Sequence, residues 1–222
     1  MDCGRKHIAV AIDGPVGVGK STVARHVAKE LGFTYVDTGA MYRAIAYYLV
    51  QKDIDIHCEK AVCQMVQDVE IGLDDEQRVF VCGEDVTDMI RTQSISASTS
   101  VTAAYKCVRM KLVDMQRKFA ASADVVMDGR DIGSCVLPNA DLKIYLDADA
   151  RIRAKRRMEE LVTKGQTVAF DDVLKETVER DERDMNRKES PLVKTEGAIL
   201  IDTGTKSVRD VVTEILEKAR QA

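Results

Sequence analysis

A glycine-rich segment that ends in lysine and serine has the composition of a phosphate-binding loop. Residues 14–21 read G-P-V-G-V-G-K-S and fit G-x-x-x-x-G-K-[ST], directly after an apolar segment and before a helical one. Glycines let the backbone N–H groups surround an anion, and the following helix adds its positive N-terminal end. The Lys20 ammonium can neutralise the β- and γ-phosphates, and the Ser21 hydroxyl can ligate Mg²⁺. The expected nucleoside triphosphate site consists of Gly14, Pro15, Val16, Gly17, Val18, Gly19, Lys20, Ser21 and Thr22.

Two arginines that follow expected strands supply a candidate site for a second anion. Arg43 follows D-T-G-A-M-Y, and Arg130 lies in D-G-R-D. Both lie at the carboxyl ends of strands, where open α/β sheets bind ligands. Switches and motors share the phosphate-binding loop, but only a kinase for a phosphorylated acceptor must hold a second dianion with arginines. A lone surface arginine is usually solvated, whereas two at strand ends favour such a kinase.

Two helical stripes of arginine could close over the phosphates. One stripe, with spacing i, i+3, i+4 and i+7, contains Arg180, Arg183, Asp184 and Arg187. The other contains Arg153, Arg156 and Arg157. Spacing alone favours salt-bridged, solvated helices, but two arginine-bearing helices joined by T-K-G-Q-T indicate a lid that excludes water during a transfer. The candidate catalytic residues are Lys20, Arg130, Arg153 and Arg157.

Strands that alternate with helices must position these side chains. Strand-like segments are His7 to Asp13, Phe33 to Asp37, Asp124 to Asp128, Leu142 to Asp147 and Ala198 to Asp202. Helical patterns are Val23 to Leu31, Tyr42 to Val50, Val108 to Ala121, Ile152 to Val162, Asp171 to Asn186 and Val208 to Ala219. This alternation predicts a parallel α/β sheet. Glu70 to Val86 interrupts it with a hairpin-like pair of segments, which we interpret as a small inserted subdomain.

Length and charge limit the classes of partner. The chain has 222 residues, 45% of them apolar, and a formal charge of −4, which gives no global attraction to nucleic acid or to an anionic membrane. The longest early apolar run, Ile8 to Ile12, is too short for a signal peptide or a membrane span. We therefore expect one domain in a cytoplasmic monomer that acts on small molecules, with no nucleic-acid or membrane partner.

The six cysteines are scattered, without a C-x-x-C pair, in a chain long enough to fold without disulfides. We expect reduced thiols. His57, Cys58 and Cys63 form the tightest cluster, but no second spaced pair accompanies them, so a structural metal site is disfavoured.

Several further motifs resemble those of bacterial cytidylate kinases, which belong to the nucleoside monophosphate kinases. In chain order they are D-T-G-A-M-Y-R-A (37–44), G-E-D-V with I-R-T (83–92), D-G-R-D-I-G (128–133), K-I-Y-L-D-A (143–148), R-D-E-R-D-M-N-R with S-P-L (180–192) and a closing D-T-G (202–204). The loop alone is unspecific, whereas this ordered set is specific and covers nearly the whole chain.

The resemblance implies a fold and a reaction. The fold is α/β: a parallel five-stranded P-loop kinase core with helices on both faces, a small β-containing insert that binds the monophosphate, and a helical lid. The expected bounds are 5–60 and 104–222 for the core, 61–103 for the insert and 151–187 for the lid. The reaction is phosphoryl transfer from ATP with Mg²⁺ to CMP and dCMP, which gives CDP and dCDP.

The resemblance also assigns roles to residues on the acceptor side. It implies that Thr38, Arg43 and Arg130 hold the acceptor phosphate, with Tyr42 and Gly129 beside them. Ser100, Arg109 and Asp131 would read the base, and Arg180, Asp184 and Arg187 would hold sugar and phosphate. Thr38 stands where many members have serine. Ser100 lies in the run S-I-S-A-S-T-S, where a shift of two residues names another serine.

Base chemistry supports this assignment. Cytosine offers an exocyclic amine, and a carboxylate such as Asp131 accepts from an amine, whereas an uncharged donor suits uracil. No general base is required, because the acceptor phosphate is already an anion; His26 and His57 are therefore expected to be structural. Kinases for UMP, AMP or shikimate remain alternatives. A GTP-gated switch is disfavoured because its D-x-x-G and N-K-x-D motifs are not found, and the charge disfavours a nucleic-acid motor.

Overall fold

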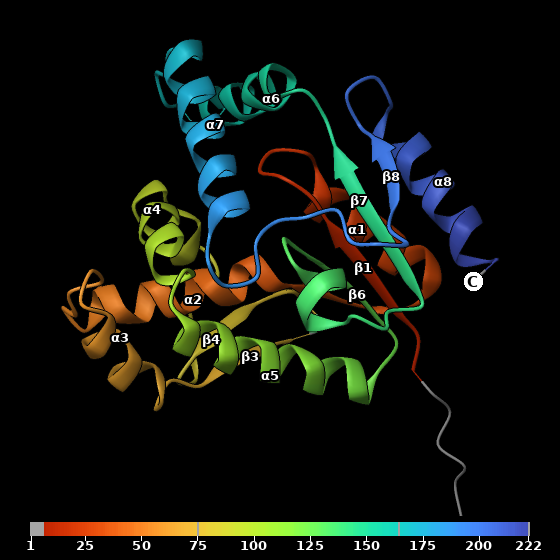
Figure 1. Ribbon diagram of the computed structural model, residues 1–222. Coiled ribbons are helices and arrows are strands. Elements are labelled where there is room, and N and C mark those ends of the chain that lie inside the picture. The colour runs from red at the N-terminus through yellow and green to blue at the C-terminus, as the bar shows by residue number, and fades with distance from the viewer. Residues whose placement is uncertain (1–6, 75, 164, 222) are drawn as a thin grey trace, which may run out of the picture.

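A five-stranded parallel sheet forms the centre of the computed structural model, which describes residues 7–74, 76–163 and 165–221 (Figure 1). Its strands, in the order β2-β6-β1-β7-β8, are Thr34–Asp37, Val125–Gly129, Ala9–Asp13, Leu142–Asp147 and Ile199–Asp202. All four pairings are parallel. The predicted strands and their parallel arrangement are confirmed.

Helices cover both faces of this sheet because its strands are apolar on both sides. In β1, Val10 and Ile12 pack with α1 (Lys20–Leu31) and α8 (Val208–Ala219), whereas Ala9 and Ala11 pack with α2 (Thr38–Gln51) and α5 (Lys106–Ser122). The two cores include residues of all five strands, and the loops that could hold a ligand follow the carboxyl ends of these strands.

A second, smaller unit lies between α2 and α5. It contains α3 (Glu59–Val66), the short 3₁₀ turn η1 (Met89–Arg91), α4 (Gln93–Thr102) and an antiparallel sheet of β3 (Ile71–Leu73), β4 (Val79–Val81) and β5 (Glu84–Asp85). The predicted hairpin is confirmed as β3 and β4. The third strand, α3 and α4 were not predicted. The helix α4 has serine and threonine at positions where apolar residues would reveal a helical period. Their hydroxyls form hydrogen bonds within the helix; Thr99 Oγ1, for example, donates to the Ile95 carbonyl at 2.6 Å.

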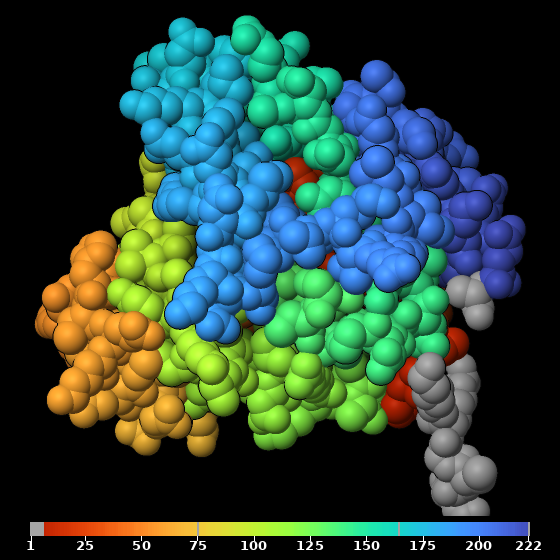
Figure 2. Space-filling view, viewed as in Figure 1, coloured from red at the N-terminus to blue at the C-terminus, as the bar shows by residue number. Residues whose placement is uncertain are grey.

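Two further helices stand over the carboxyl end of the sheet. They are α6 (Ala150–Thr163) and α7 (Phe170–Asn186), which pack through Ala154, Leu161 and Val173. A short π-helical turn, η2 (Ile132–Val136), follows β6. In the space-filling view, the segment after α7 runs across the front of the sheet, with η2 and α5 below it (Figure 2). The expected bounds of core, insert and lid stay a prediction, and residues 5, 6, 75, 164 and 222, which they include, lie outside the described residues.

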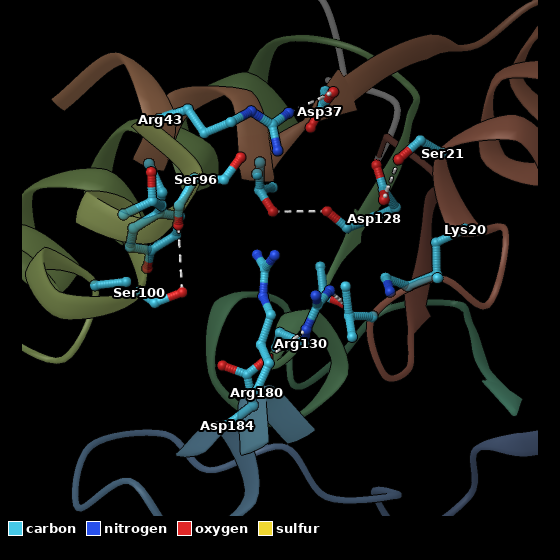
Figure 3. A pocket seen from close by; sticks show the side chains of 18 of the residues that line it. Lys20, Ser21, Asp37, Arg43, Ser96, Ser100, Asp128, Arg130, Arg180 and Asp184 are labelled. Carbon is cyan, nitrogen blue, oxygen red and sulfur yellow. Dashed lines mark hydrogen bonds and ion pairs between the residues drawn. The ribbon is translucent and has the colours of Figure 1, made fainter. Parts of the chain in front are cut away.

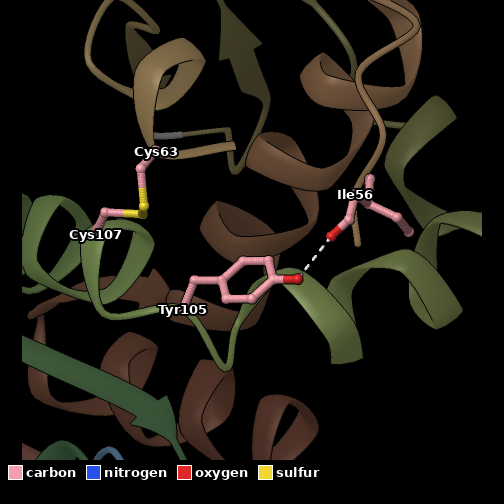
Figure 4. The surroundings of a disulfide bond; sticks show 4 residues. All are labelled: Ile56, Cys63, Tyr105 and Cys107. Carbon is pink, nitrogen blue, oxygen red and sulfur yellow. Dashed lines mark hydrogen bonds between the residues drawn. A yellow bond between two sulfur atoms is a disulfide. The ribbon is translucent and has the colours of Figure 1, made fainter. Parts of the chain in front are cut away.

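The cysteines differ from the expectation of reduced thiols. Cys63 of α3 and Cys107 of α5 form a disulfide, with their Cα atoms 5.6 Å apart (Figure 4). Next to it, the Tyr105 hydroxyl donates to the Ile56 carbonyl at 3.0 Å. The prediction was wrong because 44 residues separate the two cysteines and only the fold brings them together. Cys58, Cys82 and Cys135 are free, and Cys3 lies outside the described residues.

None of the described helices is both long and apolar enough to cross a membrane. Within the same residues, no group of three or more His, Cys, Asp or Glu side chains is arranged to hold a metal ion.

Candidate functional site

A polar cavity of about 420 Å³ opens at the carboxyl ends of β1, β2 and β6 (Figure 3). Predicted residues that line it are Val16, Gly17, Gly19, Lys20, Ser21, Thr22, Thr38, Tyr42, Arg43, Ser100, Arg109, Gly129, Arg130, Asp131, Arg153, Arg157, Arg180, Asp184 and Arg187. The remaining members of the predicted set, Gly14, Pro15 and Val18, are buried residues of the glycine-rich loop and do not line the cavity. The fold therefore gathers almost the whole set in one place.

The glycine-rich loop has a backbone that only glycine fits at its start. Gly14 has φ 150°, and a Cβ atom there would lie 2.2 Å from the Leu146 carbonyl oxygen. The close approach lets the loop leave β1 against β7 and return to begin α1 at Lys20. The first residues of α1 line the cavity, so the helix brings its N-terminal end to this site, as an anion site requires.

Lys20 lies under this loop with its ammonium bound to the loop itself. Its Nζ donates to the carbonyls of Gly14 and Pro15 at 2.8 and 2.7 Å. Burial, with the Arg130 guanidinium as the next cause, lowers the pKa of Lys20 well below its usual value. The ammonium is desolvated in this position, so an anion that enters the loop gains a strong partner.

Ser21 lies beside a carboxylate that the sequence analysis did not assign to the site. Ser21 Oγ donates to Asp128 Oδ2 at 3.1 Å, and the Tyr35 hydroxyl donates to Asp128 Oδ1 at 2.7 Å. Burial and the nearby Asp37 raise the pKa of Asp128 to about 6. A hydroxyl and a carboxylate at this spacing fit Mg²⁺, which prefers oxygen ligands and keeps several waters. The sequence feature that could have identified Asp128 is its position near the carboxyl end of β6, the strand that pairs with β1.

The acceptor arginines point into the cavity from different elements. Arg130 Nε donates to Asp184 Oδ2 at 2.8 Å, and Arg43 Nη2 lies 3.4 Å from Asp37 Oδ2. Burial raises the pKa of Asp184, but the Arg130 guanidinium lowers it by more, so the pKa of Asp184 lies below its usual value. Among the described residues, the Arg180 guanidinium has no hydrogen-bonded or ion-paired partner, and burial and Arg130 lower its pKa to about 10. Arg180 and Arg43 approach each other across the cavity (Figure 3).

The far end of the cavity carries the residues expected to read a base. Asp131 pairs with Arg109 and, at 3.3 Å, with Arg187 Nη2. The Arg109 guanidinium lies 5.5 Å from the centre of the Tyr42 ring. Ser100 and Ser96 both line the cavity, and Ser100 Oγ donates to the Ser96 carbonyl at 3.3 Å, so either serine can face a base.

Thr38 and Gly129 close the floor between the two ends. Thr38 Oγ1 donates to the Asp128 carbonyl at 2.6 Å. A Cβ atom at Gly129 would lie 2.9 Å from that hydroxyl and 2.6 Å from Ile132 Cδ1. The packing leaves no room for a side chain at Gly129.

The lid arginines differ in what they contact. Arg153 is buried, and its Nη1 lies 2.9 Å from the Val16 carbonyl and 2.6 Å from Asp181 Oδ2. Asp181, which the sequence analysis missed, also accepts from the Val16 N–H at 3.3 Å. Arg157 pairs with Glu160 at 3.1 Å at the edge of the cavity. Arg153 thus joins the lid to the loop, while Arg157 is more exposed.

The other arginines of the two stripes face elsewhere. Arg156 Nη2 donates to the Thr203 carbonyl at 2.6 Å, which joins α6 to the segment after β8. Arg183 is exposed and donates to the Glu179 carbonyl of its own helix. In the stripe on α7, the expectation of a solvated side chain therefore holds for Arg183 and not for Arg180, Asp184 or Arg187.

A family model and curated proteins match nearly the whole chain. The family model described as cytidylate kinase matches residues 10–221. Cytidylate kinase from Caldanaerobacter subterraneus subsp. tengcongensis is 49% identical, with 96% of this chain and 95% of that protein covered. The cytidylate kinase of Bacillus subtilis is 45% identical, with 97% and 98% covered.

Solved structures support the fold at much lower identity. An uncharacterised protein from Eubacterium ventriosum has a TM-score of 0.55 at 15% identity, with 98% of this chain and 100% of that chain covered. A Thermus thermophilus protein has a TM-score of 0.50 at 15% identity, with 98% of each chain covered. With its phosphate-binding loop, its parallel sheet and its close relatives, the chain belongs to the cytidylate kinase family.

Proposed function

We propose that this chain transfers the γ-phosphoryl group of ATP to CMP and dCMP, with Mg²⁺, and gives ADP with CDP or dCDP. The observation that carries the proposal is one continuous cavity with a phosphate-binding loop at one end and paired arginines with Asp131 at the other. Membership of the cytidylate kinase family supports the acceptor.

The donor end would hold the triphosphate through main-chain N–H groups of the loop and through Lys20. Ser21 and Asp128 would hold Mg²⁺, which when bound offsets the charge of the phosphate oxygens. The Lys20 ammonium has only carbonyl partners in the loop, at 2.7 to 2.8 Å, and would move from them to the phosphates. The residues of this end bind and orient the donor.

The acceptor end would hold the monophosphate with Arg43, Arg130 and Arg180, which converge from α2, from the segment after β6 and from α7. An in-line transfer between two anions needs positioning and charge neutralisation more than a base. The unpartnered Arg180 guanidinium and the lid would neutralise the moving group and exclude water.

A direct assay tests the proposed function. ADP release is measured with ATP and, in separate reactions, CMP, dCMP, UMP, AMP or no acceptor. We expect fast release with CMP and dCMP and slow release without an acceptor. Equal release with water alone would contradict the proposal. We also propose that the enzyme acts as a cytoplasmic monomer, with nucleotides and neither nucleic acid nor membrane as its partners.

Replacing Arg130 by alanine is expected to raise the KM for CMP and to leave the KM for ATP almost unchanged. Charge-assisted hydrogen bonds contribute about 1.5 to 3 kcal/mol, so the KM for CMP should rise about 10- to 150-fold. Steady-state kinetics with each substrate varied in turn measure the effect. Arg183→Ala is the matched control, since that exposed guanidinium lies on α7 and does not line the cavity. The opposite pattern, with ATP affected and CMP spared, would assign Arg130 to the donor.

Replacing Asp131 by asparagine is expected to reduce the preference for CMP over UMP. The amide keeps the shape of the carboxylate but can donate to a uracil oxygen. A base contact is worth about 1 to 3 kcal/mol, so the ratio of kcat/KM for the two substrates should fall about 5- to 150-fold. If Asp131 only orients Arg109 and Arg187, both substrates lose activity together and the ratio stays unchanged.

A further inference from the structure

Asp13 is a buried carboxylate that the proposed mechanism does not use. It is the last residue of β1, directly before the glycine-rich loop, and it is 4% exposed. Both of its oxygens accept main-chain hydrogen bonds from the chain beyond β6. The Ile132 N–H donates to Oδ1 and the Gly133 N–H donates to Oδ2, each at 2.8 Å. The hydrogen-bond partners of its side chain therefore belong to the segment after β6 and not to the donor loop that follows it in the sequence.

These two bonds hold a short span that carries two acceptor residues. In the sheet register, Asp13 pairs with Gly129 through the main chain. The chain then leaves the sheet, passes through Arg130 and Asp131 and enters η2 at Ile132. The span from 130 to 131 is thus fixed at both ends by one residue, at one end by its backbone and at the other by its carboxylate.

The carboxylate is the side chain that fits this arrangement. An ionised carboxylate only accepts hydrogen bonds, so each oxygen can face one N–H group. Burial raises the pKa of Asp13 to about 6, although the two N–H donors and Lys20 oppose the rise and Asp131 adds to it. An asparagine would point an NH₂ group at one of the two N–H donors and lose that bond.

We propose that Asp13, although it borders the donor loop, is a positioning residue for the acceptor. It sets the place of Arg130 and Asp131 and, through them, the binding of the acceptor phosphate and base. The inference rests on the proposed function, because it takes those two residues to bind CMP.

The test is Asp13→Asn, with Asp147→Asn as the matched control. Asp147 ends β7 as Asp13 ends β1, but its carboxylate is exposed and accepts from the Ala148 N–H next to it at 2.9 Å. In Asp13→Asn we expect the KM for CMP to rise about 10-fold, because a lost buried hydrogen bond has an effect of this order, and the CMP preference to shrink. The KM for ATP should change by less than about 2-fold, and the control should resemble wild type.

A rise in the KM for ATP with that for CMP spared would overturn the proposal, since it would tie Asp13 to the donor loop. Hydrogen exchange of the wild-type protein gives a second test that needs no variant. The Ile132 and Gly133 amides should exchange slowly without any nucleotide, and fast exchange would also overturn the proposal. This readout separates the two ideas, because a wild-type enzyme inactive on CMP would contradict the proposed function while leaving the exchange result intact.

Discussion

Replacing Lys20 by alanine lowers kcat about 10²- to 10³-fold, the expected effect of removing one preorganised group that stabilises transition-state charge. The ammonium is buried and held by the carbonyls of Gly14 and Pro15. Because water no longer solvates it well, its attraction to the migrating phosphoryl group is stronger than at the surface. Steady-state kinetics with saturating ATP and CMP measure the loss.

The matched control is Lys29→Ala, which removes an exposed lysine from the last turn of the same helix. It should keep normal turnover. Circular dichroism and thermal unfolding must show that Lys20→Ala is folded, because that variant leaves two carbonyls without their donor. Turnover near the wild-type value in a folded Lys20→Ala protein would refute the role of Lys20 at the donor phosphates.

Breaking the disulfide between Cys63 and Cys107 is expected to destabilise the protein more than any other change proposed here. The bond closes a loop of 44 residues. Loop-closure entropy for such a length corresponds to about 4 kcal/mol in the free energy of unfolding, which for a chain of this size lowers Tm by about 8 to 16 °C. Thermal unfolding of the oxidised protein with and without a reducing agent measures the difference.

The variant Cys63→Ala with Cys107→Ala should unfold near the temperature of the reduced wild type and should not respond to the reducing agent. Cys58→Ala serves as the control, because that thiol is free and exposed at the start of α3. The same Tm for oxidised wild type and for the double variant would contradict the prediction. Activity should survive reduction, since Lys111 Nζ still donates to the Val66 and Gln67 carbonyls at 2.7 Å and keeps α3 on α5.

The donor side could be predicted from the sequence mainly because its residues lie next to one another in the chain. The loop, its strand and its helix are neighbours in the chain, so Lys20 and Ser21 could be assigned from local order alone. Asp128 and Asp13 were missed because the hydrogen-bond partners of their side chains lie 93 to 120 residues away in the chain. A carboxylate at a strand end has no local signal that tells which distant N–H or hydroxyl it will meet.

On the acceptor side, spacing located the arginines but not their partners. Helical periodicity placed Arg180 and Asp184 on one face, and α7 confirms that helix. It could not show that Asp184 meets Arg130, or that Asp181 meets Arg153, since both pairs depend on how α7 packs over the sheet. The helix α4 was not predicted, because its many serine and threonine residues leave no clear helical period of apolar residues.

The order of the strands determines when the sheet can begin to form during synthesis. β1 is central, yet both of its neighbours come late in the chain, and the first register pair joins Ala9 to Val125. At roughly 5 to 20 residues per second, a ribosome needs roughly 6 to 23 s to add the 116 residues from Val10 to Val125. β2 also cannot pair before β6 is made, because its register begins with Thr34 opposite Val125. A nascent chain that ends before β6 therefore exposes the apolar residues Val10, Ile12 and Val36, because β1 and β2 have no strand to pair with. Such exposed apolar surface promotes aggregation, so we expect chaperones to bind the nascent chain at this stage.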